Sequence, residues 1–363
     1  MTMMSFLLIA VAFLLTALLY PPLRHFASQV GLVDHPTERK QHGEVIPLVG
    51  GIGMATSFFL LYLLAPPGGT LYLGLLLGAA IVVAIGIWDD CHDLSSTLRF
   101  VAQILAAGAM ILLDGVVLRD LGAILPGLGG TWQLGVLAIP LTIFATVGVI
   151  NALNMIDGVD GLAGSVAFTT LLAIALLALL GGATAIALLA LLLAATVAAF
   201  LLFNWRHTGK RKALLFMGDA GSMFLGFTIG WLFIHLSQGE ERAFAPVTAL
   251  WIFALPLIDT VTLMLRRILK RRSPFQADRE HFHHLLLAIG FNAHQTVFIL
   301  LGVSLLCTLF AIIAHLAAIP ESIQFLLFLL LFAAHFWIVR RAWRVKRLLK
   351  RELTPFAPTQ PSK

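Results

Sequence analysis

Charged residues are scarce in this 363-residue sequence, making up 12% of it, whereas hydrophobic residues make up 60%. An ordinary soluble domain contains roughly 25% charged residues, so a water-soluble fold could not bury this much apolar surface. Only two cysteines are present, Cys91 and Cys307, which excludes a disulfide framework. The first 20 residues also lack Lys and Arg, unlike the start of a secretory signal, and we interpret them as an uncleaved first span.

What the sequence does contain is a series of apolar runs of about 20 residues, the length that a helix needs to cross about 30 Å of hydrocarbon. We therefore predict an all-α protein, a polytopic transmembrane helical bundle with about eleven spans, whose N-terminus is periplasmic and whose C-terminus is cytoplasmic. We expect a single transmembrane domain over 1–345 and a basic, then disordered, cytoplasmic tail over 346–363. The predicted spans are 2–20, 48–65, 70–88, 98–117, 134–151, 162–180, 182–203, 219–236, 246–266, 293–318 and 323–340.

The basic residues test this topology independently, because Lys and Arg collect in the cytoplasmic loops of membrane proteins. With these spans, 22 of the 24 Lys and Arg residues, Arg99 among them, fall on the cytoplasmic side, and only Arg119 and Arg242 fall outside. A missed span would reverse every later loop and destroy this asymmetry. The same distribution explains the net charge of +6 without nucleic-acid binding. We therefore expect membrane lipids, and no nucleic acid, as partners.

The acidic residues gather at the predicted cytoplasmic ends of different spans. An ionisable side chain costs about 2.5 to 3.5 kcal/mol at the bilayer centre on insertion scales, so acids within or beside spans need a reason. The clusters are DDCHD with Asp89, Asp90 and Asp93, NALNMIDGVDGLAG with Asn154, Asp157 and Asp160, and FMGDAGS with Asp219.

The spacing within these clusters favours cation binding. If a helix continues through DDCHD, Asp93 lies three residues after Asp90 and four after Asp89, so the three carboxylates share a face. In the second cluster, Gly158 and Gly161 permit a tight turn or a close approach of a ligand. Magnesium takes only one or two protein carboxylates, so the remaining Asp residues would orient, select or relay protons.

Each cluster taken alone also fits a structural role. Asp residues are common in solvated turns, and Asp219 would also suit the N-terminus of a helix. Asp259, inside a predicted span, fits a buried hydrogen-bonding group better than a catalyst. These interpretations do not explain why all the clusters fall on one predicted membrane face.

Five motifs in this order resemble the polyprenyl-phosphate N-acetylhexosamine-1-phosphate transferases. The resemblance covers most of the chain from Asp34 to Phe291. The histidine motif resembles that of the undecaprenyl-phosphate N-acetylglucosaminyl 1-phosphate transferase branch, except that an apolar Phe282 replaces the usual apolar Ile. The motifs are DHPTERKQH with IPLVGG (34–51), DDCHD (89–93), NALNMIDGVDGLAG (151–164), FMGDAGS (216–222) and SPFQADREHFHH (273–284).

The resemblance implies roles for individual residues. Asp219 and Asn154, with Asp157 nearby, would hold Mg²⁺ or Mn²⁺ as the cofactor, and Phe216 would stack on uracil. Contacts to nucleoside, phosphate or sugar would come from Asp160, Arg279, His281, His283 and His284. The lipid phosphate would face Asp89 and Asp90, and further contacts are assigned to Asp34, Arg39, Lys40 and His42. The catalytic set is Asp89, Asp90, Asp93, Asp157 and Asp160.

The resemblance also implies the reaction: transfer of N-acetylhexosamine 1-phosphate, expected to be GlcNAc 1-phosphate, from a UDP-sugar to undecaprenyl phosphate, with release of UMP. The product would initiate a cell-envelope polysaccharide, and the active site would face the cytoplasm from the bacterial inner membrane. Two alternatives remain open, a phospho-MurNAc-pentapeptide transferase and, in a different class, a secondary transporter. Transporter sites usually lie near the bilayer midplane, whereas these clusters lie at one rim. The family resemblance also leaves a homodimer open.

Overall fold

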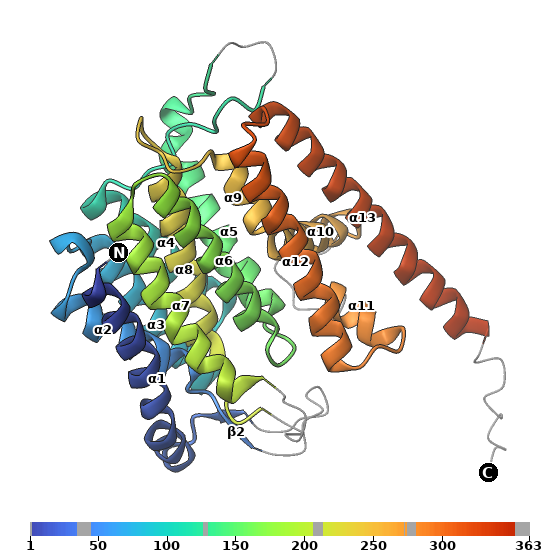
Figure 1. Ribbon diagram of the computed structural model, residues 1–363. Coiled ribbons are helices and arrows are strands. Elements are labelled where there is room, and N and C mark those ends of the chain that lie inside the picture. The colour runs from blue at the N-terminus through green and yellow to red at the C-terminus, as the bar shows by residue number, and fades with distance from the viewer. Residues whose placement is uncertain are drawn as a thin grey trace.

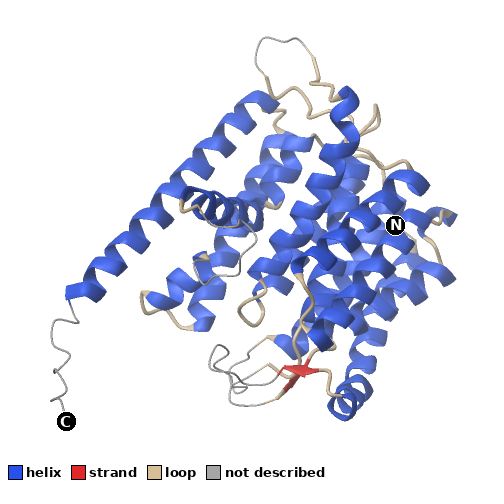
Figure 2. Ribbon diagram, turned by 180° about the vertical axis from the view of Figure 1, so that it is seen from behind, coloured by secondary structure: helices blue, strands red, loops and turns tan. Residues whose placement is uncertain are grey.

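The computed structural model of the protein describes residues 2–34, 45–125, 130–205, 213–271, 273 and 281–352, with side chains up to residue 342. These residues form a bundle of helices with two short strands at one end (Figures 1 and 2). The helices are α1 (Met3–Val30), α2 (Gly50–Leu64), α3 (Leu73–His92), α4 (Ser96–Asp114), α5 (Ala138–Ile156), α6 (Leu162–Leu180), α7 (Thr184–Asn204), α8 (Gly218–Ser237), α9 (Pro246–Ile252), α10 (Ala254–Leu269), α11 (Phe282–Ala288), α12 (Ala293–Leu316) and α13 (Glu321–Glu352). The strands are β1 (Val33–Asp34) and β2 (Ile46–Pro47), and the 3-10 helices are η1 (Pro67–Gly69) and η2 (Gly135–Leu137).

Within the described residues, nine helices are long and apolar enough to cross a membrane, so the chain is a multi-pass membrane protein with an all-helical fold. If the bent pair α9 and α10 is counted as one span, the number rises to ten. Helix α2 is also apolar, but at 15 residues it is shorter than these helices. Every predicted span coincides with a helix or with the bent pair. The total of eleven and the sides on which the termini lie stay predictions. The helical part of the predicted tail extends to Glu352, and 353–363 lie outside the described residues.

The predicted span 246–266 is not one helix, because the chain bends by 85° between α9 and α10. The break at Phe253 precedes Pro256, which has no N–H to donate to the carbonyl of Ile252 and therefore interrupts the helical ladder. After the break, α10 runs across the bundle and packs against α5, α12 and α13 (Figure 1). Its buried face carries Asp259 together with apolar residues. The predicted span 246–266 is thus divided between two helices.

Helix α8 is the centre of the bundle, since nearly all of its residues are buried and it packs against α2, α3, α5 and α6. Glycines allow the closest of these contacts. A Cβ atom on Gly51 of α2 would lie 2.1 Å from the backbone nitrogen of Gly221, and one on Gly86 of α3 would lie 2.4 Å from the Cα of Ala220. The backbones of α2 and α3 therefore contact the first turn of α8 directly, which fixes the position of Asp219.

The segment before α8 is held by the small sheet. Strands β1 and β2 pair antiparallel, with Asp34 opposite Ile46. The N–H of Phe216 donates to the carbonyl of Pro47 at 2.9 Å, and the N–H of Gly50 donates back to the carbonyl of Phe216 at 2.9 Å. Phe216 thus continues the sheet pairing immediately before the helix that carries Asp219.

Candidate active site

Asp90, near the end of α3, caps the N-terminus of α8. Its Oδ1 accepts a hydrogen bond from the N–H of Asp219 at 2.8 Å, and its Oδ2 accepts one from the N–H of Ala220 at 3.2 Å. The first N–H groups of a helix have no partners within the helix, and their positive end favours a carboxylate. Gly218 is required beside this contact, because its φ is 72° and a Cβ there would lie 2.5 Å from Oδ2 of Asp90. Asp90 therefore joins the DDCHD and FMGDAGS motifs.

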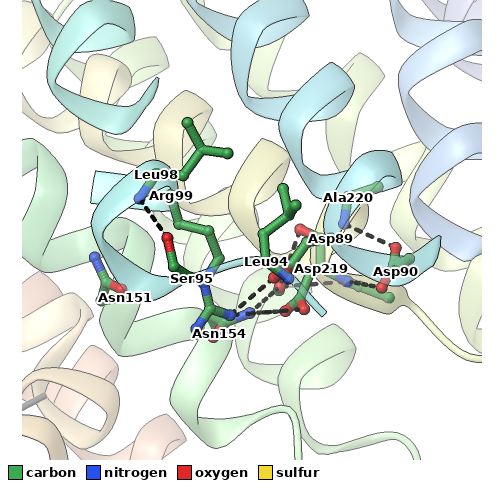
Figure 3. A network of polar contacts seen from close by, with 12 residues as sticks. Asp89, Asp90, Leu94, Ser95, Leu98, Arg99, Asn151, Asn154, Asp219 and Ala220 are labelled. Atoms are coloured by element: carbon green, nitrogen blue, oxygen red, sulfur yellow. Dashed lines mark hydrogen bonds and ion pairs between the residues drawn. The ribbon is translucent and has the colours of Figure 1, made fainter. Parts of the chain in front are cut away.

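The buried carboxylate of Asp89 forms an ion pair with the partly exposed Arg99, from the first turn of α4 (Figure 3). Its Oδ2 lies 2.8 Å from Nη1 of Arg99, and its Oδ1 accepts the N–H of Leu94 at 2.6 Å. The same Nη1 atom lies 3.9 Å from Oδ2 of Asp219. Arg99 is thus a positive charge shared between carboxylates of α3 and α8. From sequence it had only a topological role, although its place ten residues after Asp89 and across a short turn was visible.

Asn154, in the last turn of α5, brings a fourth helix to this cluster, beside α3, α4 and α8. Its Nδ2 group donates to Oδ1 of Asp219 and, at 2.8 Å, to Oγ of Ser222. Figure 3 shows Asn154, Asp219, Asp89 and Arg99 side by side, with Asp90 on the far side of Asp219. The structure therefore brings together Asp89, Asp90, Asn154 and Asp219, as the motifs predict.

The turn between α5 and α6 carries Asp157 and Asp160. Desolvation of its carboxyl group, together with the negative charges of Asp219 and Asp160, raises the pKa of Asp157. Because the Asp157 residue is exposed, solvent reduces the effect of desolvation on its pKa. The repulsion from the neighbouring carboxylates also raises the pKa, and a bound cation would offset that repulsion. The electrostatics of the turn thus favour a cation near Asp157 and Asp219.

Asn204, a residue without any motif signal, fixes this turn from the end of α7. Its Oδ1 accepts the N–H of Gly161 at 2.7 Å, and its Nδ2 donates to the carbonyl of Leu215 at 2.9 Å. The side chain is buried. Asn204 therefore ties the acidic turn to the segment that leads into Phe216 and α8.

Asp93 does not lie on the face that it would share with Asp89 and Asp90 in a longer helix, because α3 ends at His92. Asp93 is the C-cap residue, with a left-handed φ of 51°, and it is exposed. The chain turns there into α4, which places Arg99 rather than Asp93 beside Asp89. The condition on which the three carboxylates were grouped is therefore not met.

We expect Asp93→Asn to retain catalytic activity within about threefold of the unmodified protein. Asn tolerates a left-handed backbone, so the substitution removes the charge without straining the turn. The measurement is the rate, at saturating substrates, of the sugar-phosphate transfer that the five motifs predict. A loss of 100-fold or more would restore Asp93 to the catalytic set despite its placement.

His283 lies beside the acidic turn. A Cβ on Gly158 would lie 2.5 Å from Nε2 of His283, so the two motifs are in contact. Burial, and then the charges of His284 and His281, lowers the pKa of His283 to about 3. His283 therefore stays neutral and suits packing or hydrogen bonding better than charge neutralisation of a phosphate.

Four further predicted site residues make contacts within the protein. Asp34, Asp160, Phe216 and His284 each make a polar, ring or electrostatic contact. Arg39, Lys40, His42 and Arg279 lie outside the described residues, so their assignment to substrate contacts stays a prediction.

Comparison with known proteins gives the family. Residues 72–237 match the profile of Glycosyl transferase family 4. The undecaprenyl-phosphate alpha-N-acetylglucosaminyl 1-phosphate transferase of Escherichia coli (strain K12) is 37% identical to this chain over 345 residues, which cover 93% of this chain and 92% of that protein. The Yersinia pestis protein with the same name is 38% identical over 350 residues, covering 95% and 92%. The chain belongs to glycosyl transferase family 4.

In this member of glycosyl transferase family 4, the matched region runs from the start of α3 to the end of α8. It therefore holds the cluster around Asp219 and the acidic turn, while the histidine segment lies beyond it. A further relative, the protein of that name from Haemophilus influenzae, is 37% identical over 331 residues, covering 91% of this chain and 92% of that protein. The resemblance drawn from the five motifs is confirmed, and neither the muramyl-pentapeptide transferase nor the transporter alternative is favoured.

Proposed function

We propose that this protein transfers GlcNAc 1-phosphate from UDP-GlcNAc to undecaprenyl phosphate and releases UMP. The observation that carries the proposal is the convergence of Asp89, Asp90, Asn154 and Asp219 from three helices at one end of the bundle, with Arg99 between them. The names of relatives that align over more than nine-tenths of the chain support the substrates. The product begins a cell-envelope polysaccharide.

The donor set fits Mg²⁺ or Mn²⁺, which prefer carboxylate, amide and phosphate oxygens. Asp219, Asn154 and Asp157 would hold the ion. The contact between the Asn154 amide and Oδ1 of Asp219 supports this, because rotation of the amide group would turn its oxygen to the same space as the carboxylate. When bound, the ion supplies charge stabilisation to the phosphates of the sugar nucleotide.

The remaining residues position two anionic substrates. An oxygen of the lipid phosphate attacks the sugar-linked phosphorus, the bond to the bridging oxygen breaks, and its electron pair leaves with UMP. A phosphate monoester with a second pKa near 6 is already largely dianionic at pH 7, so a general base contributes little. The main requirement is to bring like charges into line, which positioning and positive charge provide. Arg99 supplies that charge, and Asp89 holds it in place.

The sugar nucleotide is assigned to the side of the cluster where Phe216 and the acidic turn lie. Phe216 stacks on the uracil, Asp160 contacts the nucleoside, and Arg279 and the histidines contact the phosphates or the sugar. The backbone hydrogen bonds that place Phe216 between β2 and α8 support this assignment, since they fix the backbone of Phe216 three residues before Asp219. Asp34 and the basic residues that follow it would contact the lipid phosphate.

The site lies at the cytoplasmic face of the bacterial inner membrane, with eleven spans, a periplasmic N-terminus and a cytoplasmic C-terminus. The distribution of Lys and Arg supports this orientation. It also suits the substrates, because UDP-GlcNAc is water-soluble whereas undecaprenyl phosphate carries its phosphate at the level of the lipid headgroups.

The proposed function is tested with the purified protein in detergent, undecaprenyl phosphate and uridine-labelled sugar nucleotide. We expect release of UMP from UDP-GlcNAc that requires both the lipid and a divalent cation, and no release from UDP-MurNAc-pentapeptide. UMP release from the pentapeptide substrate alone would replace the proposed substrate, and the absence of UMP from both would reject the transferase activity.

A further inference from the structure

Asp259, on the buried face of α10, is the centre of a polar contact that joins three segments. Its Oδ2 lies 3.1 Å from Nδ1 of His281, and its Oδ1 accepts the N–H of Phe282 at 3.1 Å. His335 of α13 approaches with Nε2 at 3.8 Å from Oδ1. The Asp259 residue is 2% exposed, so His281 and the N–H of Phe282, rather than water, satisfy the carboxylate. A buried carboxylate of this kind needs such partners.

The contact determines which nitrogen of His281 is free for a ligand. A carboxylate beside Nδ1 favours a proton on that atom and fixes the plane of the ring. In the described part of the chain, Nε2 of His281 has no hydrogen-bond partner. The hydrogen bond from the N–H of Phe282 holds the backbone next to His281 against the same carboxylate. Asp259 therefore specifies both the tautomer and the direction of His281.

The ring of His281 lies close to the proposed sugar-nucleotide site. It stacks on the ring of His283 with 5.3 Å between the centroids, and Nε2 of His283 contacts Gly158 between the two acidic residues of the α5–α6 turn. One imidazole ring thus separates His281 from the turn that carries Asp157 and Asp160.

A metal ion does not suit this group, although ligand atoms of Asp259, His281 and His283 lie within 4.8 Å of one another. The two imidazole rings are stacked and nearly parallel, with an interplanar angle of 15°. A nitrogen lone pair lies in the plane of its ring, so lone pairs of stacked parallel rings do not converge on one ion. The arrangement fits a carboxylate that orients an imidazole.

We propose that Asp259 is a positioning residue for the sugar nucleotide: by holding Nδ1 of His281, it directs Nε2 of that ring at the diphosphate or sugar of the substrate. The inference rests on the proposed function. His335 of α13 lies 3.8 Å from the same carboxylate. Helix α13, at the edge of the bundle, would thus influence substrate binding indirectly, through Asp259 and then His281.

The test compares Asp259→Asn with the unmodified enzyme in the UMP-release assay. Asn has the same size but no charge and can present its amide nitrogen to His281. We expect kcat/KM for UDP-GlcNAc to fall about 10- to 100-fold, mainly through a higher KM for UDP-GlcNAc, with an unchanged KM for undecaprenyl phosphate. Asp259→Glu, which keeps the carboxylate, should recover part of the loss.

A double-variant cycle shows whether Asp259 acts through His281. In a His281→Ala background, Asp259→Asn should lower kcat/KM by less than about threefold, because the ring that it orients is already gone. The matched control is Asp114→Asn, at the opposite end of the bundle, where Asp114 accepts hydrogen bonds from the N–H groups of Gly74 and Leu75. That control should lower the melting temperature without a selective change in the KM for UDP-GlcNAc.

Three outcomes would overturn the inference. Additive losses in the double variant would show that Asp259 acts independently of His281. An equal rise of both KM values, accompanied by a lower melting temperature, would show a purely structural role. An unmodified enzyme that releases no UMP from UDP-GlcNAc would reject the proposed function, and the inference with it, whereas the first two outcomes leave the proposed function standing.

Discussion

Asp219→Ala is expected to lower the rate of UMP release by at least about 1000-fold at saturating substrates. The carboxylate of Asp219 accepts a hydrogen bond from the amide of Asn154 and lies 3.9 Å from the guanidinium group of Arg99, while its backbone N–H donates to Asp90. Loss of the proposed metal ligand would remove several kcal/mol of charge stabilisation, and about 4 kcal/mol corresponds to about three powers of ten in rate. The measurement is kcat with both substrates saturating and the divalent cation varied.

Two further variants separate metal binding from folding. Asp219→Asn keeps the size and an acceptor for Asn154 but removes the charge, and we expect it to be nearly as inactive as the Ala variant. Asp219→Cys should be inactive with Mg²⁺ and partly active with Cd²⁺, because a thiolate prefers the softer ion. Normal turnover in Asp219→Ala would remove the proposed metal ligand from the site.

Arg99→Gln is expected to reduce kcat about 100-fold and also to destabilise the protein. The side chain of Asp89 is only 2% exposed, so removal of Arg99 leaves a buried charge without its partner. Breaking a fully buried ion pair lowers the free energy of unfolding by about 3 to 5 kcal/mol. We expect a loss of roughly 2 kcal/mol here, because the side chain of Arg99 is 32% exposed and partly screened by solvent. The measurements are kcat and the melting temperature in detergent.

The double variant Asp89→Asn with Arg99→Gln distinguishes the two effects. It has no unpaired buried charge, so its melting temperature should return towards that of the unmodified protein. Its activity should stay low, since the positive charge between the two carboxylates is still missing. Recovery of both stability and activity would show that Arg99 serves only to neutralise Asp89.

The motifs predicted the core of the site because each lies at a helix end, and alternating helices bring their ends to one side. Asp89, Asp90, Asn154 and Asp219 could therefore be grouped from sequence. Asp93 could not be placed correctly, since a three-residue spacing has meaning only while the helix continues, and α3 ends one residue earlier. The break between α9 and α10 was missed for a similar reason: Pro256 was visible, but an apolar run hides a bend.

The contacts that sequence reasoning missed are tertiary contacts. Arg99 looked like an ordinary topological charge until the turn after α3 placed it beside Asp89. Asp259 and His281 are 22 residues apart and carry no common motif, and their contact depends on the 85° bend that turns α10 towards α11. Such pairs depend on the path of the backbone, which composition and spacing alone do not specify.

The capping of α8 by Asp90 has a consequence for mutagenesis of this site. Both carboxylate oxygens of Asp90 are occupied by backbone N–H groups, one of them that of Asp219 itself. Removing Asp90 would uncap the helix and shift the neighbouring carboxylate at the same time. An inactive Asp90 variant would therefore have two explanations, the loss of the Asp90 carboxylate itself and the displacement of the Asp219 carboxylate.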